Sequence, residues 1–217
     1  MNHLNQIRKQ SNIENYNIEE NPKTPPSPIL ENNCNYDFKM VCNKENIHLK
    51  RDKVNNMFLL QLNASNSNIN LYDIVNFNIY RVLYELNKDK IEKIEIKKVI
   101  SHEEIEVLFV FKELSKDIGL KRKYMYLHVK IEDKPNQRKF LSHDIEYENM
   151  EELKGYERIR NDYSILIVNF ENQHKININY FFKFVLVEEL PIYMENILGL
   201  LMKKLFFNLK LFIENLK

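Results

Sequence analysis

The sequence is poor in the residues that build phosphate and metal sites. Its 217 residues include 3 glycines and no tryptophan. A loop that cradles a phosphate needs several glycines to bring backbone N–H groups close to the anion, so the composition argues against a nucleotide site of that kind. The 6 histidines are scattered, and no pair has the spacing of metal ligands on a helix. A metal site would have to be assembled from distant parts of the chain, and we predict neither a metal nor a cofactor.

Cysteine and excess charge are also scarce. Cys34 and Cys42 allow at most one disulfide and no secretory signal opens the sequence, so we expect reduced thiols in an intracellular, cytoplasmic protein. The 32 Lys and Arg residues nearly balance the 31 Asp and Glu residues, which predicts no polyanionic partner. Basic and aromatic residues interleave over 121–130, but the aromatic residues alternate with apolar ones, as in a core strand. We therefore predict no nucleic-acid partner.

Motifs of covalent catalysis are missing as well. The chain has no Gly-x-Ser-x-Gly nucleophile elbow. Cys42 and His48 lie on neighbouring predicted strands and could approach each other, but we favour a buried or edge thiol at Cys42. Pairs of acidic residues stand at predicted turns, where charged side chains normally meet water. We predict that the protein is not an enzyme.

The chain divides into a polar tail and one domain. Residues 1–33 are rich in Asn and Pro and bury too little apolar surface to offset the entropy of ordering, which predicts a disordered tail. Thr24 and Ser27 each precede a proline and would suit proline-directed phosphorylation, although a plain linker explains the same composition. Residues 34–217 are long enough for a domain with a substantial core.

Alternating apolar and polar residues predict an antiparallel sheet in this domain. Tyr126 and His128, for example, share one face of a predicted strand, and Leu127 lies on the other. Residues 71–86 have helical spacing, and Asn70 is placed to cap their start. The predicted strands cover residues 37–42, 47–51, 57–62, 91–100, 105–111, 124–131, 140–147, 163–170 and 176–187.

The last stretch of the chain predicts a long helix that begins after Pro191. Its apolar stripe is wider than a surface helix needs, so the helix must lie across a large apolar surface. Lys203 and Lys204 interrupt the stripe and make the helix amphipathic rather than membrane-spanning. The fold class is therefore α+β, with a curved antiparallel sheet of about nine strands packed on this helix. The residues of the stripe are Met194, Ile197, Leu198, Leu201, Leu205, Leu209, Phe212 and Leu216.

The order of these elements resembles the START (steroidogenic acute regulatory protein-related lipid transfer) domain. An apolar strand follows Arg122, as it often follows an arginine in that family. The stretch 150–158 is similar to the loop that leads through a glycine, here Gly155, to an arginine, here Arg158. A proline, here Pro191, introduces the last helix. The resemblance implies a helix-grip fold that holds one lipid in a tunnel under the C-terminal helix.

The resemblance also implies a set of lipid-contacting residues. Arg122 and Arg158 are the best polar candidates, since a guanidinium could bind a phosphate, but either could equally pair with a strand acid such as Glu106 or Glu146 and serve structure only. Tyr126 and His128 could point into the tunnel. The full predicted set is Arg122, Tyr126, His128, Arg158, Tyr180, Phe182, Met194, Ile197, Leu198, Leu201 and Leu205.

Three phenylalanines and three lysines of the last helix could touch an anionic bilayer, although for Phe206 and Phe212 we favour packing on the sheet. They are Phe206, Phe207, Phe212, Lys203, Lys204 and Lys210.

These residues predict a monomeric lipid-binding and lipid-transfer protein that docks transiently on membranes. The ligand would be one phospholipid or sterol. Two other interpretations stay open: a helix-grip sensor or cyclase-like enzyme for a hydrophobic small molecule, and an interaction module whose cavity is collapsed.

Overall fold

The computed structural model describes residues 36–112, 122–186 and 192–217, without the side chains of 184–186, 192–195 and 198. The predicted tail, Cys34 and the two candidate phosphorylation sites Thr24 and Ser27 lie outside these ranges. Of the residues described, Cys42 has a free thiol and is half-buried.

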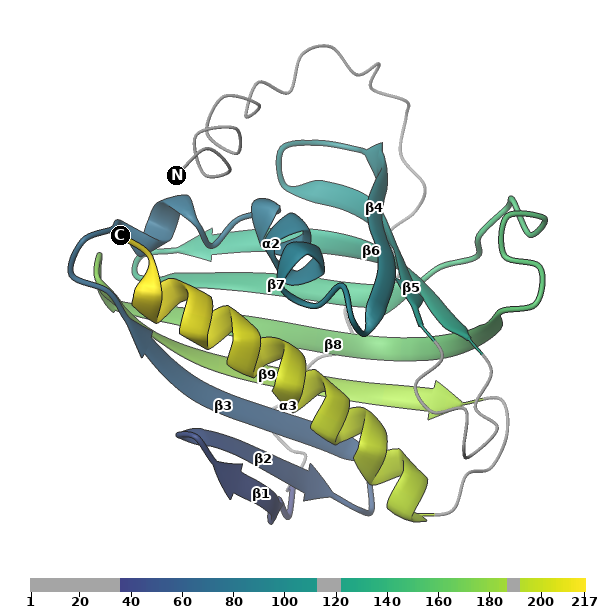
Figure 1. Ribbon diagram of the computed structural model, residues 1–217, viewed down its shortest axis with the longest axis horizontal. Helices are drawn as coiled ribbons and strands as arrows, with labels where there is room; N and C mark the ends of the chain where they lie inside the picture. The colour runs from purple at the N-terminus through teal and green to yellow at the C-terminus, as the bar shows by residue number, and fades with distance from the viewer. Residues whose placement is uncertain (1–35, 113–121, 187–191) are drawn as a thin grey trace.

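A nine-stranded, curved sheet wraps around one long helix (Figure 1). Neighbouring strands are antiparallel in the order β1-β2-β3-β9-β8-β7-β6-β5-β4, with a short parallel contact between β6 and β8. Most pairs are consecutive in sequence, and the pairing of β3 with β9 joins the first three strands to the other six. This architecture confirms the predicted α+β fold. The strands are β1 (Lys39–Lys44), β2 (Ile47–Asp52), β3 (Met57–Ser65), β4 (Ile91–Val99), β5 (Glu104–Phe111), β6 (Lys123–Lys134), β7 (Gln137–Asp144), β8 (Glu157–Asn172) and β9 (Lys175–Leu186).

Asparagine makes the tight turns that glycine would usually make. Glu45 and Asn46 join β1 to β2 with φ of 62° and 57°, and Asn136 has φ of 58° between β6 and β7. Both central residues of the β1–β2 turn have positive φ, whereas in the β6–β7 turn only Asn136, which follows Pro135, does. Asn tolerates positive φ better than most residues. The predicted hairpins at these positions are therefore confirmed in a chain with very few glycines.

The predicted helix over 71–86 is wrong as a single element. It is divided into the 3₁₀ turn η1 (Leu71–Asp73) and the helix α2 (Asn78–Leu86). Asn76 causes the break, because its side chain accepts a hydrogen bond from the backbone N–H of Asn78 and donates one to the carbonyl of Asp73. The predicted cap is confirmed, since the Asn70 side chain accepts from the backbone N–H of Tyr72 at 3.1 Å.

The helix α3 (Ile192–Asn215) crosses the concave face of the sheet (Figure 1). At Gly199 it comes very close to the sheet, because an added Cβ would lie 2.7 Å from the Phe58 ring. The buried stripe differs from the predicted one, since Phe212 and Leu216 are only half-buried. No helix in the described ranges is long and apolar enough to span a membrane. The most deeply buried apolar side chains of α3 are Met202, Leu205, Phe206, Leu209 and Ile213.

Each face of the sheet has its own apolar cluster. We call the face that packs on α2 and α3 the inner face; Leu166 and Ile178 belong to it. On the opposite, outer face a small second cluster forms where the loop of residues 145–156 covers β5 and β6. Its centre is Leu153, which is 2% exposed. The two clusters divide the alternating residues of β5 and β6 between them.

Candidate functional site

A cavity of about 60 Å³ lies between the inner face, α2 and α3. Strands β4 to β9 all contribute to its wall, and α3 closes it from the other side. This volume has room for only a few water molecules, whereas ligand cavities usually measure about 300–1,000 Å³. A lipid would therefore enter only if α3 moved away from the sheet. The lining residues are Ile79, Tyr80, Leu83, Ile91, Ile94, Phe109, Phe111, Met125, Leu127, Phe140, Ser142, Leu166, Tyr180, Met202, Leu205 and Phe206.

The polar groups of this cavity are hydroxyls. Tyr80, Ser142 and Tyr180 contribute them, and no charged residue is among the described residues that line the wall. Burial raises the pKa of Tyr180 to about 12, with a small opposing effect of a hydrogen bond from Ser164. Burial likewise raises the pKa of Tyr80, whose neighbour is the Ser142 hydroxyl. Both phenols are thus neutral over the physiological pH range and are free to donate or accept hydrogen bonds.

Two serines connect these tyrosines across the sheet. Ser142 of β7 and Ser164 of β8 face each other in the register of the strands. Ser142 is 7% exposed and Ser164 is 1% exposed. The Nδ2 of Asn161 donates to the Ser164 hydroxyl at 2.9 Å. A row of neutral polar groups therefore lies across β7 and β8 on the inner face.

Three predicted contact residues lie at or beside the cavity. Tyr180 and Leu205 line it, and the Phe182 ring stacks on those of Tyr180 and Phe58 at centroid distances of 4.8 and 5.2 Å. Ile197 and Leu201 are half-buried on α3 but are not part of the wall. The side chains of Met194 and Leu198 lie outside the description.

Tyr126 and His128 share a strand face, as predicted, but that face is the outer one. Tyr126 belongs to the outer cluster and donates its hydroxyl hydrogen to Glu106. The His128 ring lies 4.9 Å from that of His143 and its Nε2 is 3.7 Å from Glu104. The expectation that these side chains reach the cavity is wrong. Strand alternation points their neighbour Leu127 into the cavity, and Tyr126 and His128 to the opposite face.

The two predicted arginines also lie away from the cavity. Arg158 binds Glu146 and Asp144, each at 2.7 Å, so the structural alternative with Glu146 is confirmed. Burial raises the pKa of Asp144, although Arg158 opposes this effect. Arg122 donates to the Tyr156 hydroxyl at 3.2 Å. No three His, Cys, Asp or Glu side chains in the described ranges are arranged to hold a metal ion.

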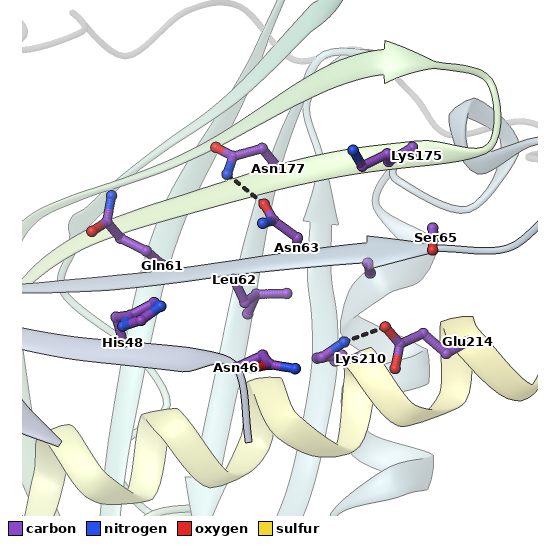
Figure 2. Close-up of a pocket in the computed structure, with 11 residues that line it drawn as sticks. Asn46, His48, Gln61, Leu62, Asn63, Ser65, Lys175, Asn177, Lys210 and Glu214 are labelled. Carbon is purple, nitrogen blue, oxygen red and sulfur yellow. Dashed lines mark hydrogen bonds and ion pairs between the residues drawn. The ribbon is translucent and has the colours of Figure 1, made fainter. Parts of the chain in front are cut away.

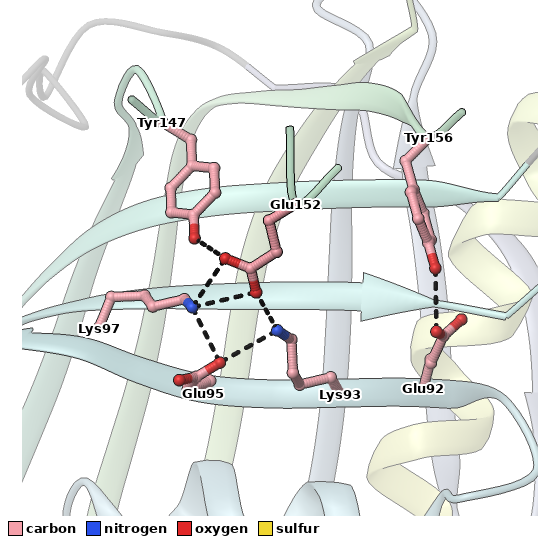
Figure 3. A network of polar contacts seen from close by, with 7 residues as sticks. All are labelled: Glu92, Lys93, Glu95, Lys97, Tyr147, Glu152 and Tyr156. Carbon is pink, nitrogen blue, oxygen red and sulfur yellow. Dashed lines mark hydrogen bonds and ion pairs between the residues drawn. The ribbon is translucent and has the colours of Figure 1, made fainter. Parts of the chain in front are cut away.

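A network of charges fastens the 145–156 loop to the outer face (Figure 3). Lys97 lies 3.1 Å from Glu152 of the loop and 3.0 Å from Glu95 of its own strand. Lys93 and the Tyr147 hydroxyl also bind Glu152. Hydrogen bonds from Lys93 and Tyr147 lower the pKa of the Glu152 carboxyl to about 2, against a smaller opposing effect of burial. These contacts hold the loop over the outer cluster.

Two of the three lysines expected to face a bilayer are buried on α3. The Lys203 amine lies 3.2 Å from Glu45 in the β1–β2 turn, and Lys210 pairs with Glu214. Lys204 alone of the three is exposed, and its amine lies over the Phe207 ring. Phe206 is 3% exposed and contacts Tyr180, which confirms that it packs on the sheet.

A second hollow of about 430 Å³ opens beside the C-terminal part of α3 (Figure 2). It lies where β3 runs on past the start of β2, and its wall includes His48, Asn177 and Lys210. The side chains of Asn177 and Asn63 are bonded to each other at 2.6 Å. Its polar wall suits water better than an apolar ligand.

Sequence analysis missed Tyr80 and Ser142. The signal for Ser142 is its position two residues after the buried Phe140, which places both on one strand face. No sequence pattern places Ser142 opposite Ser164, because that pairing depends on the register of β7 with β8.

No protein-family model and no curated protein sequence matches this chain. Solved structures do match its fold. The lipid transfer and protein localization domain of human StarD13 superposes with a TM-score of 0.67 at 13% identity, covering 83% of this chain and 91% of that one. Human StAR-related lipid transfer protein 5 gives 0.65 at 13% identity, with 82% and 86% covered.

A bacterial structure agrees with the human ones. A STAR-related lipid transfer protein from Xanthomonas axonopodis gives a TM-score of 0.58 at 12% identity, covering 80% of this chain and 94% of that one. All three matches cover 80% or more of this chain with a TM-score above 0.5. The chain therefore has the START-like helix-grip fold.

Proposed function

We propose that this protein binds one lipid between the inner face and α3 and carries it between membranes. The observation that supports this proposal most directly is the uncharged, mainly apolar cavity under α3. The structural neighbours that are named for lipid transfer support it as well. The proposed protein is a cytoplasmic monomer without enzymatic activity that docks on membranes only transiently.

Apolar burial supplies the affinity in this proposal. Each CH₂ group moved from water to an apolar site contributes about 0.8 kcal/mol, so an acyl chain or a ring system gains several kcal/mol in such a cavity. Expansion from about 60 Å³ requires α3 to leave the sheet, together with Met202, Leu205 and Phe206. The same three side chains would then contact the lipid.

The exposed side of α3 is the proposed membrane contact. Leu200 and Leu211 are 43% and 41% exposed there, and Lys204 lies between them in sequence. Apolar side chains beside an amine suit the interface of an anionic bilayer. We place Ile197, Leu201 and Tyr180 at the ligand or at its entrance, with Phe182 behind them, and extend the same proposal to Met194 and Leu198. Arg122, Tyr126, His128 and Arg158 have no place in it.

The small volume of the cavity favours a second candidate. An interaction domain with a closed core would need no more space than about 60 Å³. In that case the inner face serves stability alone, and function lies on the surface. The helix-grip sensor or enzyme is not supported by any described side chain with a catalytic arrangement.

Native mass spectrometry of the purified chain separates the two candidates. We expect a mass increase of one lipid per chain, either on purification or after incubation with vesicles of mixed lipids. Extraction and identification of that lipid would then be followed by a transfer assay between donor and acceptor vesicles. A chain that stays empty under both conditions would favour the closed interaction domain.

A further inference from the structure

The polar hollow beside α3 lies along a free edge of the sheet (Figure 2). Strand β2 begins at Ile47, opposite Leu62, whereas β3 and its pairing with β9 continue to Ser65. Among the described strands, β9 is therefore the sole partner of residues 63–65. Alternate residues of such a strand direct their backbone N–H and C=O groups to the open side. This edge is a template for one more short strand, in line with β2.

The outer side of the hollow carries a row of amides. The Gln61 side chain donates to Asn179 at 2.8 Å, and Asn179 donates to Asn177 at 2.6 Å. Asn177 donates in turn to Asn63 at 2.6 Å. Asn63 ends the row, and its Nδ2 group makes no hydrogen bond within the described residues. A further amide side chain placed beside Asn63 would extend the row.

The inner side of the hollow is less polar. Leu62 and Ala64 border it there, in front of the last turns of α3. The lysines of the wall are already paired, Lys210 with Glu214 of the same helix and Lys175 with a glutamate at 2.7 Å. Successive side chains of an extended strand point to opposite faces. The hollow therefore suits a strand that alternates amide with apolar side chains.

One stretch of the N-terminal region has this alternation. Residues 15–18 read Asn-Tyr-Asn-Ile, which places both amides on one side of an extended strand, and Tyr16 and Ile18 on the other. Tyr and Ile also favour strands. The stretch 22–28 is unsuited to the same place, because its four prolines have no N–H to donate to the edge.

The chain is long enough for this stretch to reach the hollow. The backbone N–H of Asp37 donates to Asp52 at 3.1 Å, and Asp52 is the last residue of β2. The hollow lies at the first residue of β2, which is about 20 Å away for a strand of this length. Residues 19–35 span about 55 Å when extended. Such a tether raises the effective concentration of the segment at the edge.

We propose that residues 15–18 bind in the hollow as a short strand on the free edge of β3. The two asparagines extend the amide row at Asn63, and Tyr16 and Ile18 lie over Ala64 beside the last turns of α3. Backbone hydrogen bonds supply the affinity, and the alternation of side chains sets the register. The segment thereby fastens the C-terminal part of α3 to the sheet. This binding does not depend on the proposed lipid function.

Hydrogen-exchange mass spectrometry of the full chain, without added lipid, tests the proposal. The variant carries both Tyr16→Pro and Asn17→Pro, because one of two successive N–H groups must face β3. We expect residues 61–66 to exchange about fivefold faster in this variant, the factor that corresponds to one net backbone hydrogen bond. The matched control carries Gln10→Pro and Ser11→Pro and should exchange like the unaltered chain. Thermal melts establish that the domain folds in both.

A synthetic peptide of residues 12–21 should restore slow exchange at 61–66 when it is added to the Tyr16→Pro/Asn17→Pro variant. A scrambled peptide of the same composition should not. Equal exchange of 61–66 in the unaltered chain and in this variant would overturn the proposal, and so would an equal effect of the control variant or of the scrambled peptide. Slow exchange that disappears on dilution would overturn binding within one chain and assign the hollow to a second copy.

Discussion

The two faces of the sheet carry their polar groups in opposite ways. On the outer face, Glu152 binds Lys93 and Lys97 in a half-exposed network. On the inner face, the polar groups of β7 and β8 nearest the cavity are neutral and deeply buried, such as Ser142 and Ser164, whereas the buried Lys123 pairs with Glu157 at the start of β6 and β8. Exposed ion pairs contribute little to stability, and buried hydroxyls without charge contribute less than the apolar side chains they replace. The charged groups of the outer face thus secure a loop, whereas the neutral hydroxyls of the inner face lie beside the cavity.

The apolar clusters of the two faces also differ in extent. The inner cluster joins α2, α3 and most of the strands, while the outer one joins two strands and a loop. Damage to the inner cluster should therefore affect the whole domain, and damage to the outer one should stay local. Substitutions on each face can test this difference.

The largest effect is expected for Phe182→Ala. Phe182 is 0% exposed and stacks on two aromatic rings of the inner face. Removal of a fully buried aromatic ring should lower the free energy of unfolding by about 3–5 kcal/mol. Urea denaturation measures this change. Phe181→Ala, one residue away on the outer face, is the control and should cost far less; equal losses would mean that the faces do not differ in this way.

Leu153→Ala should destabilise the outer cluster by about 2–3 kcal/mol. Because Leu153 comes from the loop and not from a strand, the loss should appear mainly as faster amide exchange in residues 145–156. Hydrogen-exchange mass spectrometry can follow each segment. If the strands β8 and β9 lost protection to the same degree as the loop, the two clusters would have to be regarded as one.

Gly199→Ala tests how closely α3 must approach the inner face. The new Cβ would stand 2.7 Å from the Phe58 ring, which is held by stacking on Phe182. Overpacking should outweigh the roughly 1 kcal/mol gain in helix propensity, for a net loss of about 1–2 kcal/mol. Leu200→Ala on the exposed side is the control. A rise in stability of Gly199→Ala would show instead that the Phe58 ring moves aside without cost.

The smallest effect is expected for Glu152→Gln. The pKa of Glu152 is about 2, below its ordinary value, so its ionised form stabilises the fold above about pH 4.5. That contribution is lost as the pH falls toward 2. Since Glu152 is partly exposed, we expect a loss of less than about 1 kcal/mol at neutral pH and a flatter stability profile between pH 4.5 and 2. If Glu152→Gln and Glu151→Gln had the same pH profile of stability, Glu152 would not take part in the outer-face network.

Sequence patterns predicted the sheet and the last helix because both depend on alternation and periodicity within one segment. They did not predict the break at Asn76, where a side chain competes with the backbone. The inward face of β6 was also misjudged at Tyr126, because strand residues on both of its faces are buried and apolar character no longer distinguishes them. The polar part of the site could not be predicted from one segment, because Ser142 lies opposite Ser164 only through the register of β7 with β8.

The pairing of β3 with β9 has a consequence for how the chain folds. Gln61 and Asn179, which pair across these strands, are 118 residues apart in sequence. Strands β1 to β3 therefore have no place in the sheet until β9 has formed, so the search for this pairing should slow folding. Meanwhile β3 presents an open edge that other chains can join. Dilute conditions during refolding should accordingly raise the yield of native protein.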